Sequence, residues 1–178
     1  MGYRHTKEEI LEAALAAAFD EGLSRLTFGR LARRLGISDR VVVYYFPSKD
    51  DLIGEVLGSL GLRLQATLAP TLSTPVDGHA ALVRAMWPLL ARPEVDPVFA
   101  LFFEAGGLAA AGVEPYATLV PVLMAGWIDW AGAFVRGTVA HRRTEASAAI
   151  AVVDGLLLVR QLAGAAVADR AARALGAR

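Results

Sequence analysis

The sequence contains no cysteine, and only three histidines occur among its 178 residues. The absence of cysteine excludes a disulfide framework, a thiolate metal site and cysteine-based catalysis. The histidines, His5, His79 and His141, lie far apart in the sequence, whereas a catalytic zinc needs about three protein ligands that converge. We therefore expect neither a metal site nor a cofactor.

Long uncharged runs and catalytic motifs are missing as well. The apolar stretches of the second half are interrupted by Glu104, Asp129, Asp154 and Arg160, so none reaches the roughly 18 uncharged residues of a membrane span. The N-terminus is polar and acidic, unlike a signal peptide. No HExxH motif, phosphate-binding loop or Ser/His/Asp arrangement is present. We expect a cytoplasmic protein that has no membrane partner and is not an enzyme.

The chain also lacks net charge, because 18 lysines and arginines balance 18 aspartates and glutamates. The charges are distributed unevenly along the chain. Residues 24–49 contain five arginines and one lysine against one aspartate, a net charge of +5, whereas residues 1–23 and 50–55 carry −3 each. A concentrated basic segment supplies the attraction to phosphates that dominates nucleic-acid affinity. This segment therefore indicates a nucleic-acid partner that the overall charge conceals.

The remaining signals predict helices almost throughout. Alanine and leucine dominate, and no stretch alternates apolar and polar residues as a half-exposed strand would. The run Val41–Phe46 has strand-forming residues, but its flanks predict a helix. Capping boxes at residues 6–9 and 48–51 start two of the helices. The predicted helices cover residues 6–22, 27–35, 38–46, 48–69, 77–91, 97–110, 115–140 and 145–165, and a short last helix ends at about residue 175.

Residues 27–46 have the spacing of a helix-turn-helix motif. Two short helices flank a turn of about three residues that contains Gly36, which can adopt the left-handed conformation such a turn requires. In this motif the second helix enters the major groove of DNA with its N-terminal residues at the base edges. Six apolar residues have the spacing to bury the helix pair: Phe28, Leu31, Ala32, Ile37, Val42 and Phe46.

Residues 4–60 combine this motif with further short sequences that resemble the tetracycline-repressor (TetR) family of one-component regulators. They are Thr27-Phe28, Leu31-Ala32, Leu35-Gly36-Ile37-Ser38 and Tyr44-Tyr45-Phe46-Pro47-Ser48-Lys49-Asp50-Asp51-Leu52. The resemblance implies an all-α fold, with a three-helix DNA-binding domain at residues 4–64 and a helical-bundle domain at residues 76–178 for ligand binding and dimerisation. It also implies a homodimer that represses transcription at a palindromic operator in double-stranded DNA. A small apolar or amphipathic effector would release it.

The resemblance assigns DNA contacts by position. Thr27 and Lys49 would contact phosphates, Arg40, Val41 and Tyr44 would face the bases, and Ser38 and Asp39 would lie at the start of the recognition helix. Arg30 and Tyr45 complete the expected DNA-binding set. This chain has Val43 where the family usually has an aromatic residue, and Tyr45 where it usually has histidine. Which of Tyr44 and Tyr45 faces DNA is left open.

The second half offers candidates for the effector site, which are apolar and aromatic side chains at helical spacing. They are Met86, Trp87, Phe99, Phe102, Phe103, Trp127 and Trp130. Such residues line apolar ligand pockets, but they equally form ordinary helix cores. Glu104 is expected to bind a cationic or hydroxyl group of the effector, or else to be a surface carboxylate. Asp154 and Arg160 are expected to be paired or to lie at an interface.

Small residues concentrate at positions 131–166, where we expect the dimer interface, although an intramolecular bundle would use them in the same way. Two other functions fit the same sequence. One is an architectural DNA-binding protein without an effector, and the other is a helical enzyme.

Overall fold

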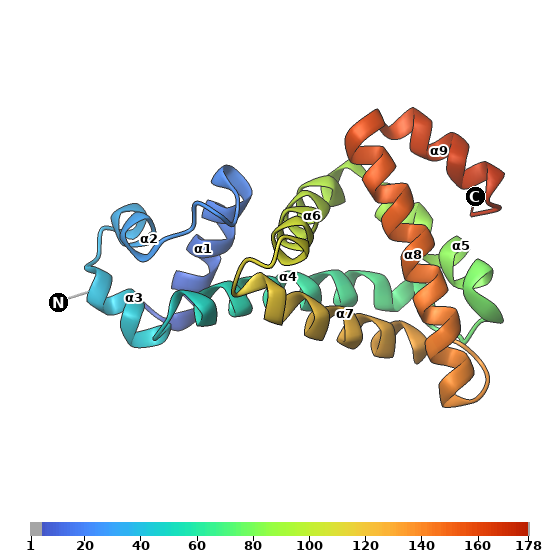
Figure 1. Ribbon diagram of the computed structural model, residues 1–178, viewed down its shortest axis with the longest axis horizontal. Coiled ribbons are helices and arrows are strands. Elements are labelled where there is room, and N and C mark those ends of the chain that lie inside the picture. Colours follow the sequence, from blue (N-terminus) through green and yellow to red (C-terminus); the bar gives the residue numbers. More distant parts are fainter. Residues whose placement is uncertain (1–4, 178) are drawn as a thin grey trace. The chain divides into compact units, whose positions relative to one another are not determined.

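The computed structural model describes residues 5–177 and is built from α-helices (Figure 1). Within these residues there are nine α-helices, two short 3-10 helices and no named strand. The helices are α1 Lys7–Glu21, α2 Phe28–Leu35, α3 Asp39–Tyr45, α4 Lys49–Leu68, α5 Gly78–Leu90, α6 Asp96–Ala110, α7 Tyr116–Gly132, α8 Val139–Ala163 and α9 Ala165–Ala174. The expected all-α fold is confirmed, including the helix at residues 41–45, where strand-forming residues stand.

The first helices begin and end where local chemistry predicts. Thr6 accepts a hydrogen bond from the backbone N–H of Glu9, and the Glu9 carboxylate accepts one from the N–H of Thr6, which together form a capping box. Ser48 and Asp51 repeat this exchange at the start of α4, with distances of 3.0 and 3.1 Å. Gly22 ends α1 with a φ of +88°, a value that L side chains rarely adopt.

The described chain forms two compact units. The first contains the N-terminal helices up to Gly61 together with Leu101–Val120. In it, α1 packs on α2 and α2 packs on α3 (Figure 1). The core side chains of these helices are almost fully buried: Ile10, Ala14, Leu31, Ala32, Val42, Phe46, Leu52 and Ile53.

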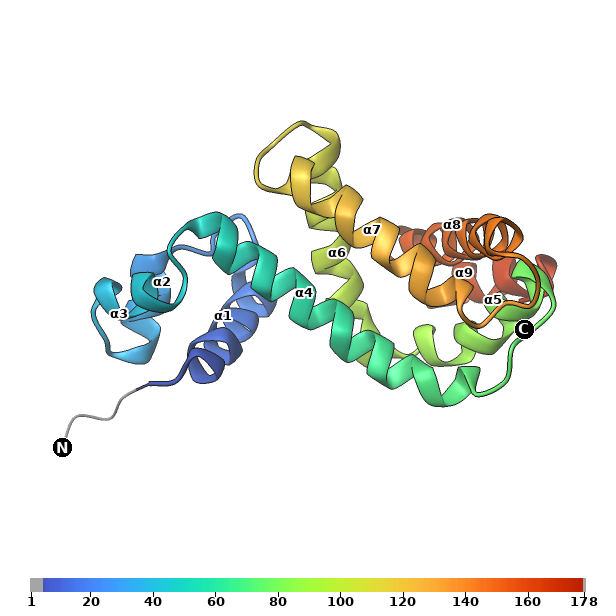
Figure 2. The ribbon, with the colours of Figure 1, turned by 90° about the horizontal axis from the view of Figure 1, so that it is seen from below.

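The second unit contains Leu62–Ala100 and Pro121–Arg178. Within it, α8 lies beside both α5 and α9 (Figure 2). Polar contacts fix these helices. Glu145 of α8 accepts hydrogen bonds from the backbone N–H of His79, at 2.6 Å, and contacts the Nδ1 atom of the same residue at 2.7 Å. These hydrogen bonds lower the pKa of the Glu145 carboxyl.

Two predicted boundaries in this unit are wrong. The predicted helix 115–140 ends at Gly132, and the next helix begins at Val139 rather than near residue 145. Thr138 caps the new helix by accepting from the N–H of His141. Between the helices, a short parallel bridge joins Val135 to Val76. This pairing across nearly sixty residues is a tertiary interaction that helical periodicity cannot reveal.

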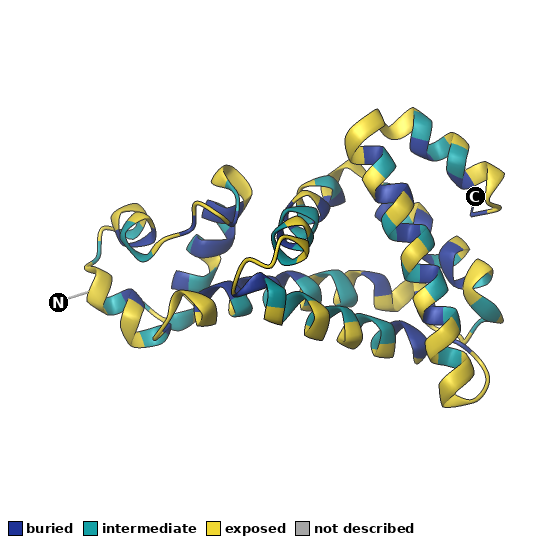
Figure 3. Cartoon of the chain, viewed as in Figure 1, coloured by how far each residue is buried: buried dark blue, intermediate teal, exposed yellow. Residues whose placement is uncertain are grey.

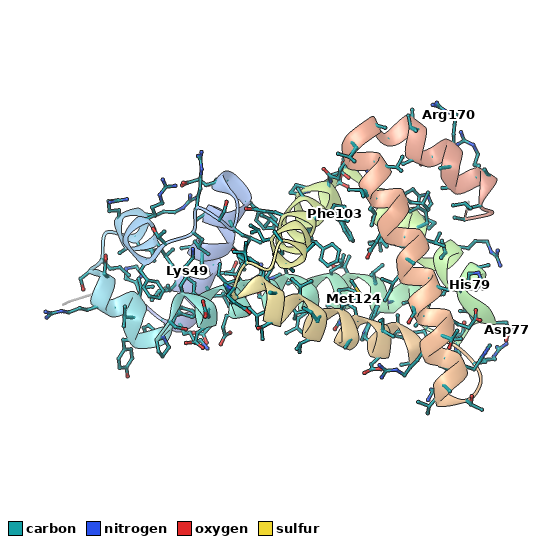
Figure 4. The ribbon with its side chains drawn as sticks, viewed as in Figure 1. Lys49, Asp77, His79, Phe103, Met124 and Arg170 are labelled. Carbon is teal, nitrogen blue, oxygen red and sulfur yellow. The ribbon has the colours of Figure 1, made fainter. Side chains whose placement is uncertain are left out.

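Asp77 stands at the N-cap position of α5. The side chain of Asp77 makes no capping hydrogen bond in the structure. It accepts instead from the guanidinium of Arg136, with the shorter distance at 2.9 Å. Figure 4 shows Asp77 and His79 together at the start of α5.

Helix α8 is long and apolar enough to cross a membrane by length and composition alone, with a mean hydropathy of 1.6 over 18 residues. Figure 3 shows buried and exposed residues alternating along it. Its buried residues recur at helical spacing: Ala146, Ala149, Val153, Leu156, Leu157 and Arg160. This spacing is typical of a helix that packs with one face against the other helices of its unit.

Candidate nucleic-acid interface and regulatory site

The turn between α2 and α3 has the geometry expected of a helix-turn-helix. Thr27 caps α2 by accepting from the N–H of Arg30 at 3.3 Å. Gly36 ends α2 in the left-handed conformation, with φ +68° and ψ +30°. A residue with a Cβ atom would be strained there, which explains glycine at this position. Ser38 stands at the N-cap of α3, but its hydroxyl makes no capping hydrogen bond.

Helix α3 has an apolar inner face and a polar outer face. Val42 and Phe46 are fully buried, four residues apart. Arg40 and Tyr44 are also four residues apart, on the exposed side, and 79% of Tyr44 is accessible to solvent. Residues at this spacing lie one above the other on a helix. The inner pair therefore anchors α3 to its unit and leaves the outer pair free for a partner.

The structure separates the roles of the two adjacent tyrosines. The hydroxyl of Tyr45 donates a hydrogen bond to the backbone carbonyl of His5 at 3.0 Å, and its ring is half-buried. The ring of Tyr44 meets that of Tyr45 edge to face, at 4.9 Å between centroids, and is otherwise exposed. The hydroxyl of Tyr45 is therefore used in a hydrogen bond within the protein, whereas Tyr44 is exposed.

The basic residues of this segment fall into two groups. Arg30 pairs with Glu21 at 2.6 Å, and Arg34 pairs with Asp20 at 2.7 Å, so both hold α2 against the end of α1. Arg40, in contrast, has no ion pair within residues 5–177. Exposed ion pairs contribute at most about 1 kcal/mol, so Arg30 and Arg34 can exchange their partners for a phosphate at little cost.

The other predicted DNA-binding residues lie at exposed ends of helices. Lys49 is the first residue of α4 (Figure 4) and is exposed. Asp39, the first residue of α3, is exposed as well, and its carboxylate lies beside Gly29 of α2. Val41 is half-buried. The predicted set thus gathers on α3 and on the starts of the helices that flank it in sequence.

The predicted effector-binding residues are not brought together in one unit. In the second unit, Met86, Trp87 and Phe99 are buried. Trp127 and Trp130 are half-buried, and their rings meet edge to face with centroids 5.2 Å apart. The indole N–H of Trp87 has no hydrogen-bond acceptor among the described residues. A buried donor without an acceptor costs free energy, and the core of this unit contains one such donor in Trp87.

Three predicted effector residues on α6, Phe102, Phe103 and Glu104, belong to the first unit. The ring centroids of Phe102 and Phe103 lie 5.5 Å apart. Glu104 makes hydrogen bonds within the protein. Its two carboxylate oxygens accept from the backbone N–H groups of Leu23 and Ser24, both at 2.9 Å. Sequence reasoning missed this contact, because nothing local links positions eighty residues apart.

The two charged residues in the middle and end of α8 differ in their surroundings. Arg160 is buried and donates two hydrogen bonds to the carboxylate of Asp96, at 2.5 and 3.0 Å, so its expected pairing is confirmed. These bonds raise the pKa of the Arg160 guanidinium. Asp154 has no hydrogen bond or ion pair within residues 5–177, and burial alone raises the pKa of its carboxyl from 3.8 to about 6.

The family comparison agrees with the geometry of the first unit. Residues 10–56 match the model of the bacterial regulatory proteins of the tetR family. This match covers α1, α2, α3 and the start of α4, which include the helix-turn-helix. No curated protein matches the sequence.

Solved structures of similar fold extend over nearly the whole chain. One is a regulator from Rhodococcus sp. described as belonging to the TetR family, with 19% identity and a TM-score of 0.70, covering 89% of this chain and 88% of its own. A second is the multidrug-binding protein EbrR complexed with proflavin, with 25% identity, a TM-score of 0.65 and coverage of 95% and 98%.

A third is a transcriptional regulator from Saccharomonospora viridis in complex with choline, with 20% identity, a TM-score of 0.61 and coverage of 86% and 83%. The helix-turn-helix geometry, the family match over that segment and the shared all-α fold agree. Residues 10–56 are similar to the tetR family of bacterial regulatory proteins, and the fold of the chain is that of solved transcriptional regulators.

Proposed function

We propose that the protein is a homodimeric, ligand-responsive repressor that binds a palindromic operator in double-stranded DNA. The outer face of α3, with Arg40 and Tyr44 exposed above the buried pair Val42 and Phe46, is the observation that supports this function best. An arginine can read a guanine edge with two hydrogen bonds. A helix anchored on one face and polar on the other fits the major groove.

Each predicted DNA contact has a role in this proposal. Arg40, Val41 and Tyr44 face the bases, and Ser38 and Asp39 lie at the start of the recognition helix. Thr27, Arg30 and Lys49 contact phosphates, with Arg30 exchanging Glu21 for a phosphate. Tyr45 acts indirectly, because its hydroxyl is already bound to the carbonyl of His5. Such phosphate contacts position the protein, whereas the base contacts specify the sequence.

The proposed dimer uses the outer face of α8. Ala151 and Gly155 are exposed there, next to Leu158 and Leu162, whose exposed fractions are 42% and 79%. Small residues allow two helices to approach closely. Burial of the exposed leucines under a second copy would stabilise the dimer. A two-fold dimer would present two recognition helices about 34 Å apart to a palindromic site. The proposed division into a DNA-binding domain at 4–64 and a regulatory domain at 76–178 follows from these roles.

The proposed effector is a small apolar or amphipathic molecule bound in the regulatory domain. Choline and proflavin, the ligands of two proteins of similar fold, are both organic cations. The half-buried carboxylate of Asp154, which lacks a partner within residues 5–177, would accept such a group. The aromatic pair Trp127 and Trp130 offers ring faces to a cation in the same unit. Met86, Trp87 and Phe99 supply apolar surface.

Selection of bound DNA from a random pool tests the operator and the dimer together. We expect a palindrome, each half of which is protected by one recognition helix. Enrichment of a single half-site would contradict the dimer, and the absence of any enriched sequence would contradict specific repression.

Thermal-shift measurements test the effector. We expect cationic amphipathic compounds, choline and proflavin among them, to stabilise the protein, because a ligand that binds only the folded state raises the apparent stability. The absence of stabilisation by any apolar or cationic compound would favour an architectural DNA-binding protein. The proposed regulator acts in the cytoplasm and catalyses no reaction.

A further inference from the structure

Tyr45 joins the end of α3 to the segment that precedes α1. Its hydroxyl donates a hydrogen bond of 3.0 Å to the backbone carbonyl of His5, forty residues earlier, in a part-buried position. Helix α3 has only seven residues, and helices of this length are not stable without tertiary contacts. The orientation of α3 therefore depends on the few contacts that hold it, and the bond from Tyr45 holds its last residue.

The carbonyl that accepts this bond belongs to a segment held by several contacts. His5 directly precedes Thr6, whose capping box starts α1. Lys7 pairs with Glu55 of α4 at 2.5 Å, and its Nζ atom lies 5.5 Å from the centroid of the Phe46 ring. The segment is thus fastened to both α1 and α4, and it gives the hydroxyl a fixed acceptor.

The ring of Tyr45 also supports its neighbour Tyr44. The two rings meet edge to face, with their centroids 4.9 Å apart and their planes at 85°. Tyr44 is 79% exposed, and its hydroxyl makes no hydrogen bond within residues 5–177. Edge-to-face contacts between aromatic rings are attractive, so the ring of Tyr45 favours one orientation of a side chain that little else restrains.

We propose that Tyr45 is a positioning residue for sequence recognition, which fixes the exposed ring of Tyr44 through contacts that begin at the carbonyl of His5. Tyr45 itself does not touch DNA. This proposal rests on the proposed function, in which Tyr44 faces the bases. A side chain that is ordered before binding loses less conformational freedom on binding, and base contacts are those that specify the sequence. The contacts of Tyr45 therefore favour the operator over other sequences.

A double-mutant cycle in the full-length protein tests this role. Affinity is measured by fluorescence anisotropy, on the DNA sequence that the wild type selects and on an unrelated duplex. Tyr45→Phe keeps the ring and removes the bond to His5, so operator binding should weaken about three- to tenfold. Binding to unrelated DNA should not change, because phosphate contacts carry no sequence information.

The same substitution in a Tyr44→Ala background separates positioning from a purely structural role. Since Tyr45 acts through Tyr44 in this proposal, Tyr45→Phe should cause no further loss of affinity when Tyr44 is absent. The matched control is Tyr116→Phe, which removes a buried hydroxyl without a hydrogen bond among the described residues and should leave both affinities unchanged. An equal loss with and without Tyr44 would overturn the proposal, as would unchanged operator affinity or an equal loss on both duplexes.

NMR of the free protein tests the ring contact without DNA. Tyr45→Leu should shift the ring-proton signals of Tyr44 toward those of an unstructured tyrosine, because the adjacent ring is lost, and unchanged signals would overturn the proposal. If Tyr45→Phe does not fold, Tyr45→His takes its place with the same expected loss of affinity, because its shorter ring does not reach the carbonyl of His5. A wild type that selects no DNA disproves the proposed function, while the ring signals still report on the contact between the two tyrosines.

Discussion

The helix-turn-helix and the helical unit around α8 satisfy their polar groups in opposite ways. In the helix-turn-helix and at the start of the next helix, caps join residues three positions apart, as in Thr27 with the N–H of Arg30 and Ser48 with that of Asp51. Around α8, the main pair joins Arg160 to Asp96, 64 positions apart, and Asp154 has no partner within residues 5–177. The helix-turn-helix therefore depends mainly on local contacts, while the unit around α8 depends more on tertiary contacts.

The largest effect expected on this comparison is the loss of the pair between Arg160 and Asp96. Asp96→Ala would leave a buried guanidinium without its carboxylate, and we expect the free energy of unfolding to fall by about 2–4 kcal/mol. Denaturant titration followed by circular dichroism measures this change. Asp77→Ala is the matched control, because it removes the exposed pair with Arg136 and should cost less than about 1 kcal/mol. An equal loss of unfolding free energy in both variants would show that burial of the pair does not determine its contribution to stability.

Truncation of the exposed side chains of α3 should weaken operator binding while leaving the fold intact. Arg40→Ala and Tyr44→Ala should each weaken operator binding by about 1–3 kcal/mol, and the double variant should abolish detectable binding in a gel shift. Melting temperatures should stay at the wild-type value, since both side chains are exposed. Arg173→Ala, at an exposed position of α9, serves as a control that should bind normally. Wild-type affinity in both single variants would contradict the placement of the recognition helix.

The unpartnered carboxyl of Asp154 should make the second unit more stable in mild acid than at neutral pH. Burial raises the pKa of this carboxyl from 3.8 to about 6, so the folded state holds the proton more tightly than the unfolded state. The contribution to the free energy of unfolding is therefore fully present below about pH 4 and is lost as pH rises to about 6. Asp154→Asn should be more stable than the wild type at pH 7, by about 1–3 kcal/mol.

Unfolding free energies at pH 4 and pH 7 measure this difference. The two proteins should be equally stable at pH 4, because the wild-type carboxyl is then protonated. Asp129→Asn, at an exposed carboxylate paired with Arg143, provides the comparison at both values. A stability gap between wild type and Asp154→Asn that does not depend on pH would rule out this account of the buried carboxyl.

The smallest effect is expected at the edge of the DNA-binding segment. Lys49→Ala should weaken binding to all sequences alike and should lower the slope of log affinity against log salt concentration by about 1, as expected for one lost phosphate contact. Titrations of operator and unrelated DNA at several salt concentrations measure the slope. A loss confined to the operator would instead make Lys49 a base-reading residue.

The same contrast explains what could be predicted from the sequence. The capping boxes, the turn at Gly36 and the buried pair Val42 and Phe46 depend on residues within a few positions of one another, and the structure contains all of them. The predicted end of α7 and the predicted start of α8 are wrong: the segment between the two helices pairs with Val76 through Val135, a tertiary contact that helical periodicity does not reveal.

The partners of individual carboxylates were harder to predict still. Asp77, a reasonable helix cap by position, contacts Arg136 instead. Glu104, expected to bind an effector or solvent, contacts the backbone of a loop eighty residues earlier. A carboxylate can accept from any donor that the fold brings near, so its partner is decided by packing and not by the neighbouring sequence.

The two-faced character of α3 has a consequence for how such regulators diversify. Because Val42 and Phe46 are buried whereas Arg40 and Tyr44 are largely exposed, we expect mutations at the outer positions to alter recognition with little effect on folding. A duplicated gene could therefore acquire a new target site through a few substitutions and keep its inherited chemical signal. An engineer could follow the same route, exchanging the outer residues to build repressors that ignore one another's operators.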